Sequence, residues 1–399
     1  MTQQQSPYQI LTLNQISSVG LKRFPEAAYE IGNDIKKPDA ILVRSQNMLD
    51  LDIPASVKAI GRAGAGVNNI PVDKMSARGT PVFNAPGANA NAVNELVMAS
   101  MLMSSRNLVP ALRFVAGIEG EDKALHELVE KEKKHYAGVE LPERSIGIIG
   151  LGAIGSLVAN TATKLGMSVL GYDPDLTVDA AWRLPSTVKR MHSIEELVRQ
   201  SEFISLHVPL NDKTRKLIDA KRVAAMRNGT VLLNFAREGL IDEDAVLEGL
   251  NSKKIKWYVC DFPTKKLKDH ARVVAFPHLG ASTEEAEENC ARMVVDQVRD
   301  FLENGNIRNA VNLPDVAMPR EAAHRVGIVN ANVPNMLGQI STTMAQAKLN
   351  IHNMMNKSKG DLAYTLVDVD SSITAAVVKK LASIEGVLSV RAIPLRAHG

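Results

Sequence analysis

The chain has 399 residues, of which 45% are hydrophobic, and a formal net charge of +3. This length can bury sizeable cores and predicts two or three domains. Because basic and acidic residues are evenly mixed, the sequence gives no reason to expect a nucleic-acid or membrane partner. The only cysteines, Cys260 and Cys290, lack metal-ligand spacing, so no metal site is expected. No signal pattern or long apolar run is present, which favours a cytoplasmic protein.

Residues 8–86 alternate short apolar segments with candidate helices, which is typical of a small, flavodoxin-like α/β unit. The predicted strands lie at 10–13, 40–43, 57–61 and 81–83. A long helix is predicted next, over 92–115, with an apolar row that packing against a neighbouring element explains.

A second block repeats the alternation of strand and helix. Its predicted strands lie at 146–149, 169–172, 203–207, 231–235, 257–260 and 273–276. Helical segments lie between most of them, so the pattern predicts a doubly wound, Rossmann-type parallel sheet. Ligands of such sheets bind at the carboxyl ends of the strands.

The turn after the first of these strands reads GLGAIG and opens a helix. Its first glycine permits a tight turn, its second lets the backbone approach a pyrophosphate, and its third lets the helix lie close on the sheet. The helix N-terminus favours an anion. An acid at the end of the next strand would bind ribose hydroxyls and repel a 2′-phosphate, which predicts NAD rather than NADP. The predicted contacts are Gly150, Gly152, Ala153, Ile154, Gly155 and Asp173.

A helix over 283–302 then leaves this sheet and is expected to return to the first block. In the last block the predicted order is βαββαβ, a ferredoxin-like unit. A proline-containing segment with little periodicity precedes it and is predicted to be a linker. We therefore expect a discontinuous substrate-binding domain (1–91 plus 283–310), an NAD-binding domain (92–282) with a cleft between the two, a linker (311–322) and a small regulatory domain (323–399).

Two polar residues follow strands of the second block, where α/β enzymes collect their sites. Arg237 could hold a carboxylate through a bidentate fork and polarise an adjacent carbonyl, or it could pair with a neighbouring acid. His278 could exchange a proton with a substrate hydroxyl, because imidazole titrates near neutral pH, although a lone histidine is more often structural.

Two arginines of the first block also follow predicted strands. Arg44 precedes Ser45, and Arg62 stands just before the glycine-rich run that begins at Gly64. Guanidinium groups beside backbone N–H donors suit a phosphate or carboxylate across a cleft. Surface salt bridges are the alternative for both arginines.

Four motifs, at 64–70, 150–155, 234–237 and 277–283, occur in the order and spacing of the D-isomer-specific 2-hydroxyacid dehydrogenases. The chain resembles this family over nearly its whole length, and its last block resembles an ACT domain, a small effector-binding module. The resemblance implies NAD-dependent oxidation of D-3-phosphoglycerate to 3-phosphohydroxypyruvate, the first step of L-serine biosynthesis. It also implies a homodimer or a homotetramer.

The resemblance also implies roles for single residues. Arg237 would anchor the substrate carboxylate and the C2 oxygen, while His278 would remove the hydroxyl proton as hydride leaves for NAD⁺. The implied contacts to the substrate's anionic groups are Arg44, Ser45, Arg62 and Gly64. Further implied cofactor contacts are His207, Pro209, Ala236, Asp261 and Gly280. The implied contacts to an amino-acid effector, serine, are Asn330, Asn332 and Asn350.

Lys265 departs from the family pattern, because it stands where the family has a glutamate that pairs with the catalytic histidine. A carboxylate would favour the protonated imidazole, whereas an ammonium would disfavour it. Oxidation of an alcohol needs a neutral imidazole as base, so the replacement is compatible with that direction. Asp269, Glu284 or Glu285 could substitute for the missing acid.

The effector module departs from the pattern as well. Asn330 stands where serine-sensitive relatives have a histidine, and an asparagine keeps a hydrogen bond without the proton chemistry of histidine. Asn335 stands where those relatives have a glycine in the turn. The alternative to serine control is a domain that serves only in dimer packing.

Two other functions stay open at this point. The first is a related dehydrogenase acting on glyoxylate, hydroxypyruvate or 2-hydroxyglutarate, and Arg44 and Arg62 argue against the smaller uncharged substrates. The second is a non-catalytic NAD-sensing regulator. The missing glutamate favours that regulator, whereas the presence of Arg237 and His278 argues against it.

Overall fold

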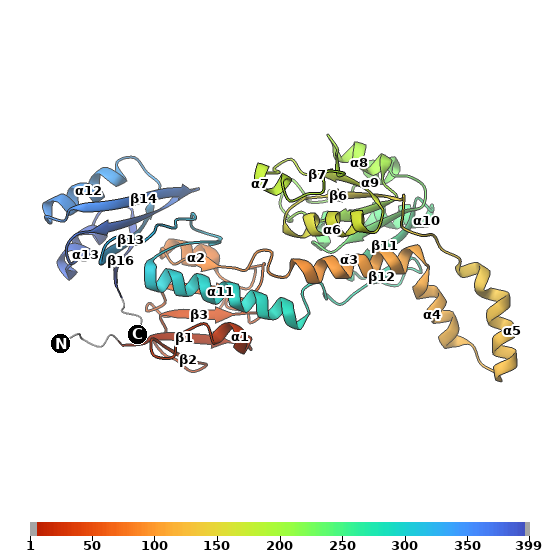
Figure 1. Ribbon diagram of the computed structural model, residues 1–399, viewed down its shortest axis with the longest axis horizontal. Coiled ribbons are helices and arrows are strands. Elements are labelled where there is room, and N and C mark those ends of the chain that lie inside the picture. Colours follow the sequence, from red (N-terminus) through yellow and green to blue (C-terminus); the bar gives the residue numbers. More distant parts are fainter. Residues whose placement is uncertain (1–5, 396–399) are drawn as a thin grey trace. The chain divides into compact units, whose positions relative to one another are not determined.

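The computed structural model describes residues 6–395 and forms two compact units (Figure 1). The first unit combines the chain up to residue 89 with the chain from residue 284 onward, and the second unit spans 90–283. The first unit therefore contains both the N-terminal sheet and the C-terminal one. The four-part division predicted from the sequence, with its boundaries, stays a prediction.

The N-terminal part of the first unit is a five-stranded parallel sheet in the order β2-β1-β3-β4-β5. The sequence did not indicate β2, a short edge strand. Helix α11 lies against this sheet, and a Cβ placed on Gly61 would lie 2.7 Å from Val294 of that helix. The elements are β1 (Tyr8–Leu13), α1 (Ser18–Leu21), β2 (Tyr29–Gly32), β3 (Ala40–Val43), β4 (Ala59–Arg62), α2 (Val72–Ala77), β5 (Val82–Phe83) and α11 (Glu284–Asn304).

The C-terminal part is a four-stranded antiparallel sheet in the order β14-β15-β13-β16, with the βαββαβ chain order that the sequence predicts. Its two helices cover one face of the sheet (Figure 1). The other face packs on α11, where Tyr364 and Ile393 share a core with Phe301. The elements are β13 (His324–Ala331), α12 (Met336–Gln346), β14 (Ile351–Lys359), β15 (Leu362–Val369), α13 (Ala375–Ala382) and β16 (Val387–Pro394).

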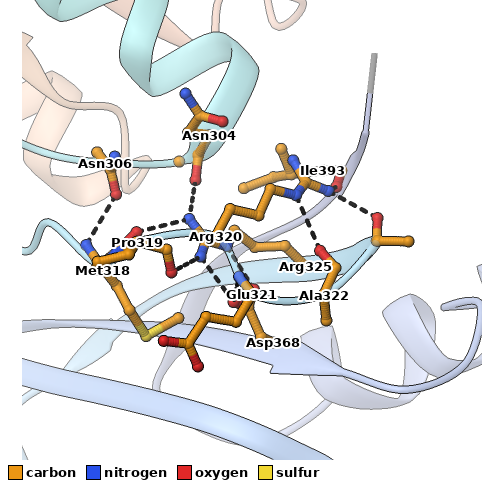
Figure 2. A network of polar contacts seen from close by, with 12 residues as sticks. Asn304, Asn306, Met318, Pro319, Arg320, Glu321, Ala322, Arg325, Asp368 and Ile393 are labelled. Carbon is orange, nitrogen blue, oxygen red and sulfur yellow. Dashed lines mark hydrogen bonds and ion pairs between the residues drawn. The ribbon is translucent and has the colours of Figure 1, made fainter. Parts of the chain in front are cut away.

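A fully buried ion pair, Arg325 with Asp368, ties this sheet to the preceding segment (Figure 2). The guanidinium Nε and Nη2 donate to the two carboxylate oxygens at 2.5 and 2.8 Å. Its remaining donors bind backbone carbonyl oxygens at 2.7 to 3.1 Å, those of Asn304, Met318 and Pro319. The pair therefore joins β13, β15 and the end of α11, and no polar atom of the guanidinium is left without a partner.

The charge state of this pair depends on pH. Burial alone would raise the pKa of Asp368, but hydrogen bonds from Arg325 and from the backbone N–H of Glu321 outweigh burial and leave the pKa lowered. The ionised pair therefore contributes its full stability at neutral pH. That contribution is lost as the pH falls from about 4, the range of an unfolded aspartate, through the lowered pKa of the folded state.

The second unit is a seven-stranded parallel sheet in the order β12-β11-β10-β9-β6-β7-β8, with apolar cores on both faces. The predicted doubly wound sheet is confirmed, with a short edge strand, β8, added. Its strands are β6 (Ser145–Ile149), β7 (Ser168–Tyr172), β8 (Lys189–Arg190), β9 (Phe203–Leu206), β10 (Thr230–Asn234), β11 (Ile255–Cys260) and β12 (Val273–Ala275). Its helices are α3 (Ala90–Ser105), α4 (Leu108–Gly117), α5 (Asp122–Glu132), α6 (Ala153–Lys164), α7 (Val178–Ala181), α8 (Ile194–Gln200), α9 (Ala220–Ala225) and α10 (Glu243–Asn251).

The single long helix predicted over 92–115 is wrong, because the chain breaks between α3 and α4. Asn107 adopts a left-handed backbone conformation there, with φ +50°. Its side-chain amide donates to the carbonyl oxygen of Ala137 at 2.9 Å and accepts from the indole of Trp257 at 3.3 Å. Asparagine tolerates this conformation better than most residues. The partners in its two hydrogen bonds are distant in the sequence, so local pattern did not indicate the break.

Across the described residues, 6–395, we find no helix whose length and apolar character would let it cross a membrane.

Replacing Arg325 by methionine should lower the free energy of unfolding by about 3–5 kcal/mol, because Asp368 would remain buried without its counter-charge. The double variant Arg325→Met/Asp368→Leu should recover most of this loss, because neither charge then remains. Urea unfolding followed by circular dichroism measures both. As a control, Arg23→Ala removes an ion pair with Asp296 that is about half exposed and should cost less than about 1 kcal/mol. Equal losses for Arg325→Met and Arg23→Ala would contradict the role given to the buried pair.

Candidate active site

The turn between β6 and α6 has the close approaches that a dinucleotide cradle needs. Gly150 has φ +91°, and a Cβ on it would lie 2.5 Å from the carbonyl oxygen of His207. A Cβ on Gly155 would lie 1.9 Å from the carbonyl oxygen of Gly150, so the helix can meet the strand only through a glycine. A Cβ on Gly152 meets nothing within 4 Å. The open space in front of Gly152, at the start of α6, fits a pyrophosphate that approaches the helix N-terminus.

The carboxylate of Asp173, just after β7, is held by this same turn. Its Oδ2 accepts from the backbone N–H of Leu151 at 2.8 Å, and its Oδ1 accepts from that of Asp175 at 3.0 Å. Asp173 also lines a cavity of about 450 Å³ together with Pro174 and Pro185. A fixed carboxylate at the edge of a cavity of this size fits the ribose of a nucleoside.

Asp261, directly after β11, organises the segment that follows β12. Its side chain is buried, and its two oxygens accept from the backbone N–H groups of Leu279 and Gly280, each at 2.7 Å. His278, which directly precedes Leu279, has a left-handed backbone conformation with φ +57°. Its imidazole is exposed and lies edge-on to the ring of Phe262, with 5.0 Å between the ring centroids. Asp261 therefore positions the backbone immediately after the candidate proton acceptor.

Arg237, after β10, presents an exposed guanidinium at the same end of the parallel sheet. Its backbone is held by the buried side chain of Asn234, which donates to the carbonyl oxygen of Arg237 at 2.9 Å. Asp242, an acid that could have neutralised it, binds Lys216 at 3.0 Å instead and caps α10. The guanidinium is therefore free of that acid and able to take a carboxylate.

His207, which follows β9, is neutral at physiological pH because burial lowers its pKa to about 4. Its Nε2 lies 2.8 Å from the hydroxyl of Ser205, and its buried Nδ1 has no partner. Pro209, which is exposed, and Ala236, whose N–H donates to Asn234 at 3.3 Å, follow the ends of β9 and β10. These predicted cofactor positions all stand at the carboxyl end of the sheet.

The predicted anion-binding residues of the first unit form one cluster after β3 and β4. Arg44 makes an ion pair with Glu287 of α11, so the salt-bridge alternative is realised for this residue. Arg62 donates from Nε to the carbonyl oxygen of Arg44 at 3.1 Å. Gly64 has φ +155°, a backbone conformation that favours glycine. Ser45 is exposed beside them.

Lys265, at the place of the family's glutamate, is exposed in the segment after β11. Asp269, one possible substitute for that acid, instead binds Lys268 at 2.7 Å. Within the described part of the second unit, no carboxylate oxygen lies within 4.0 Å of the His278 imidazole. The His278 imidazole instead contacts the ring of Phe262 edge-on.

The three predicted effector residues differ in their surroundings. The amide of Asn330 donates to the carbonyl oxygen of Ala331 at 2.7 Å, and its buried Oδ1 has no partner. Asn332 donates to the carbonyl oxygen of Gly360 at 3.1 Å, and the Asn350 side chain is exposed. Asn335 has φ +65° at the start of α12, a conformation that glycine adopts readily and asparagine tolerates.

Comparison with known proteins agrees with this geometry. Residues 98–280 match the model of the D-isomer specific 2-hydroxyacid dehydrogenase, NAD binding domain. The chain is 31% identical over 378 residues to the D-3-phosphoglycerate dehydrogenase of Haemophilus influenzae, covering 91% of this chain and 88% of the relative. This chain belongs to the D-isomer-specific 2-hydroxyacid dehydrogenases. Its second unit is accordingly the NAD-binding domain of that family.

Two further proteins are similar to this chain: a longer relative and a solved structure of lower sequence identity. The D-3-phosphoglycerate dehydrogenase of Methanocaldococcus jannaschii is 36% identical over 296 residues, 72% of this chain and 54% of the relative. The chain thus spans about half the length of several curated dehydrogenases that it matches. An NAD⁺-bound 3-phosphoglycerate dehydrogenase from Entamoeba histolytica is 26% identical, with a TM-score of 0.59 over 77% of this chain and 99% of that structure.

The sequence did not indicate a role for two residues of this dehydrogenase site, Asn234 and Phe262. Asn234 holds the backbone of Arg237, and the available signal was a polar residue that ends an otherwise apolar buried strand. Phe262 packs on His278, and nothing in the sequence distinguishes it from an ordinary core aromatic. The sequence placed Asp261 beside the cofactor, whereas the structure adds its bonds to Leu279 and Gly280.

Replacing Gly152 and Gly155 by alanine, one at a time, should distinguish an effect on NAD binding from an effect on stability. Gly152→Ala puts a methyl group into the open space, so NAD should bind about tenfold more weakly or worse while the thermal midpoint is unchanged. Gly155→Ala forces the same group against the carbonyl oxygen of Gly150 and should cost about 1–3 kcal/mol of stability. Calorimetric titration with NAD and thermal unfolding measure the two effects. Normal NAD affinity in Gly152→Ala would rule out a pyrophosphate at that position.

Proposed function

We propose that this chain oxidises D-3-phosphoglycerate to 3-phosphohydroxypyruvate with NAD⁺, the first step of L-serine biosynthesis. The observation that carries the proposal is the likeness to the Haemophilus influenzae D-3-phosphoglycerate dehydrogenase, which extends over most of both chains. The cluster of Arg44 and Arg62 supports a substrate with more than one anionic group.

In the proposed reaction, Arg237 anchors the substrate carboxylate and polarises the C2 oxygen, while Arg44, Ser45, Arg62 and Gly64 bind the phosphate. The neutral imidazole of His278 accepts the C2 hydroxyl proton. Bound NAD⁺ supplies the acceptor for the C2 hydride, and the turn 150–155 with Asp173 would hold it. The exposed guanidinium of Arg237 and the exposed imidazole of His278 support these roles, because both can reach a ligand from the sheet's carboxyl end.

A second candidate is oxidation of a related 2-hydroxy acid without a phosphate, such as 2-hydroxyglutarate. The ion pair of Arg44 with Glu287 favours this candidate, because the pair leaves less positive charge for a phosphate. Binding of the phosphate would require Arg44 to exchange Glu287 for the substrate. Comparison of D-3-phosphoglycerate with 2-hydroxyglutarate in one assay distinguishes the two.

We also propose that the enzyme is a homodimer or a homotetramer and that its C-terminal module is an ACT-type regulatory domain. Helices α4 and α5 support an oligomer, because neither has a buried residue and α4 exposes Leu112 and Val115 by 68% and 56%. The buried, unpartnered oxygen of Asn330 supports an amino-acid ligand near the end of β13. Light scattering and the addition of L-serine to the turnover assay test these two proposals.

His278→Ala should lower kcat by about 10²–10⁴-fold, because the proton acceptor is removed, while NAD still binds through the glycine turn. NADH formation with D-3-phosphoglycerate, and a separate titration with NAD, measure the two properties. Lys268→Ala, an exposed change in the same unit, is the matched control and should retain normal turnover. Near-normal turnover of His278→Ala would remove this residue from the mechanism.

Lys265→Glu should shift the acid limb of the kcat/KM profile for oxidation to higher pH. The reason is that a new carboxylate near His278 would favour the protonated imidazole, which is inactive as a base. Measuring kcat/KM from about pH 6 to about pH 10 locates the acid limb of each variant. Lys266→Glu in the adjacent position is the control. An unchanged acid limb in Lys265→Glu would mean that this position does not face the imidazole.

A further inference from the structure

The first unit contains a cavity of about 270 Å³ between its N-terminal sheet and its C-terminal sheet. The segments before β4 and between α2 and β5 form one side, through Lys58, Arg78 and Gly79. Strands β15 and β16 form the other side, through Tyr364 and Arg391. A cavity of this volume is far larger than a single water molecule needs.

The charged side chains on its wall are all basic. Lys58 is neutralised by Asp39, 2.6 Å away, whereas Arg78 and Arg391 have no carboxylate oxygen within 4.0 Å among the residues that the structure describes. Arg78 donates to the carbonyl oxygens of two loop residues, Ile53 and Pro54, at 2.9 and 2.8 Å. Two guanidinium charges therefore face one cavity without a counter-charge.

Arg391 is the more enclosed of the two. It lies over the ring of Phe301, 4.2 Å from the centroid, and donates to the carbonyl oxygens of Phe301 and Leu302. Burial lowers the pKa of this guanidinium, which reflects the cost of removing its charge from water. Backbone carbonyls offset only part of that cost, and a full negative charge would offset more of it.

The wall also offers neutral hydrogen-bonding groups. The hydroxyl of Tyr364 donates to the carbonyl oxygen of Gly305 at 2.7 Å, and that of Ser389 donates to the carbonyl oxygen of Gly79 at 3.2 Å. Each guanidinium has more N–H donors than its carbonyl partners use. Cationic forks and hydroxyls around a small cavity are the groups that bind phosphate and carboxylate oxygens.

We propose that this cavity binds a small oxyanion, either a phosphate or a carboxylate group, between the two sheets of the first unit. The ligand would contact Arg78 from the N-terminal side and Arg391 from the C-terminal side. It would thereby add an ionic link to the docking of the C-terminal module. The site lies before β4, whereas the proposed substrate residues Arg44 and Arg62 lie at the opposite, carboxyl ends of β3 and β4.

The test uses the full chain with Arg62→Gln, so that the proposed substrate site contributes little to phosphate binding. Calorimetric titration with sodium phosphate should show one site per chain, and sodium chloride at the same ionic strength should not replace phosphate. Adding Arg78→Gln should weaken phosphate binding at least tenfold. The control is Lys74→Gln, which removes an exposed cation from α2 outside the cavity and should leave binding unchanged. Titration with sodium acetate shows whether a carboxylate alone suffices.

A second variant keeps the result interpretable if Arg78→Gln disturbs the fold. Arg78→Lys retains the charge and should bind phosphate within a few-fold of the parent chain, and the thermal midpoint without phosphate reports folding for each variant. Failure of the Arg62→Gln chain to bind phosphate, or equal binding with and without Arg78→Gln, would overturn the proposal. Neither outcome touches the proposed activity, which the turnover of D-3-phosphoglycerate by the wild-type chain tests separately.

Discussion

The buried carboxylate of Asp261 accepts hydrogen bonds from two consecutive backbone N–H groups, those of Leu279 and Gly280, each 2.7 Å long. Bonds to an ionised acceptor are among the stronger hydrogen bonds in proteins, and a buried carboxylate without them would be costly. The chain after β12 must therefore turn so that both N–H groups point inward. That turn leaves His278 with φ +57° and its imidazole exposed. The catalytic role proposed for this histidine would depend on that constraint.

A comparable constraint acts in the first unit. Arg325 and Asp368 satisfy each other only when β13, β15 and the end of α11 are all in place, so the pair links the C-terminal sheet to α11. A ligand in the cavity beside Arg391 would add a further ionic link. Lys58, which lines the cavity, directly precedes β4, and Arg62 ends that strand, so the cavity and the proposed substrate residues lie at opposite ends of one short strand.

The sequence predicted those features that local pattern encodes. Apolar strands that alternate with helices predicted the parallel sheet of the second unit. Gly150 and Gly155 have the tight turn and the close helix packing assigned to them, whereas the pyrophosphate contact of Gly152 stays a prediction. The edge strands β2 and β8 were missed because they are short and partly polar. The break at Asn107, the ion pair of Arg44 with Glu287 and the contact of Phe262 with His278 depend on residues distant in the chain or on side-chain orientation. Local pattern does not encode such contacts.

The predicted replacement of the family's glutamate by Lys265 would remove a carboxylate from beside His278. A carboxylate beside a catalytic histidine does two things: it orients the ring and it favours the charged form. In this chain the edge of Phe262 contacts the imidazole, which restricts the ring without adding charge. Phe262 can therefore supply the first of these two effects, the orientation of the ring.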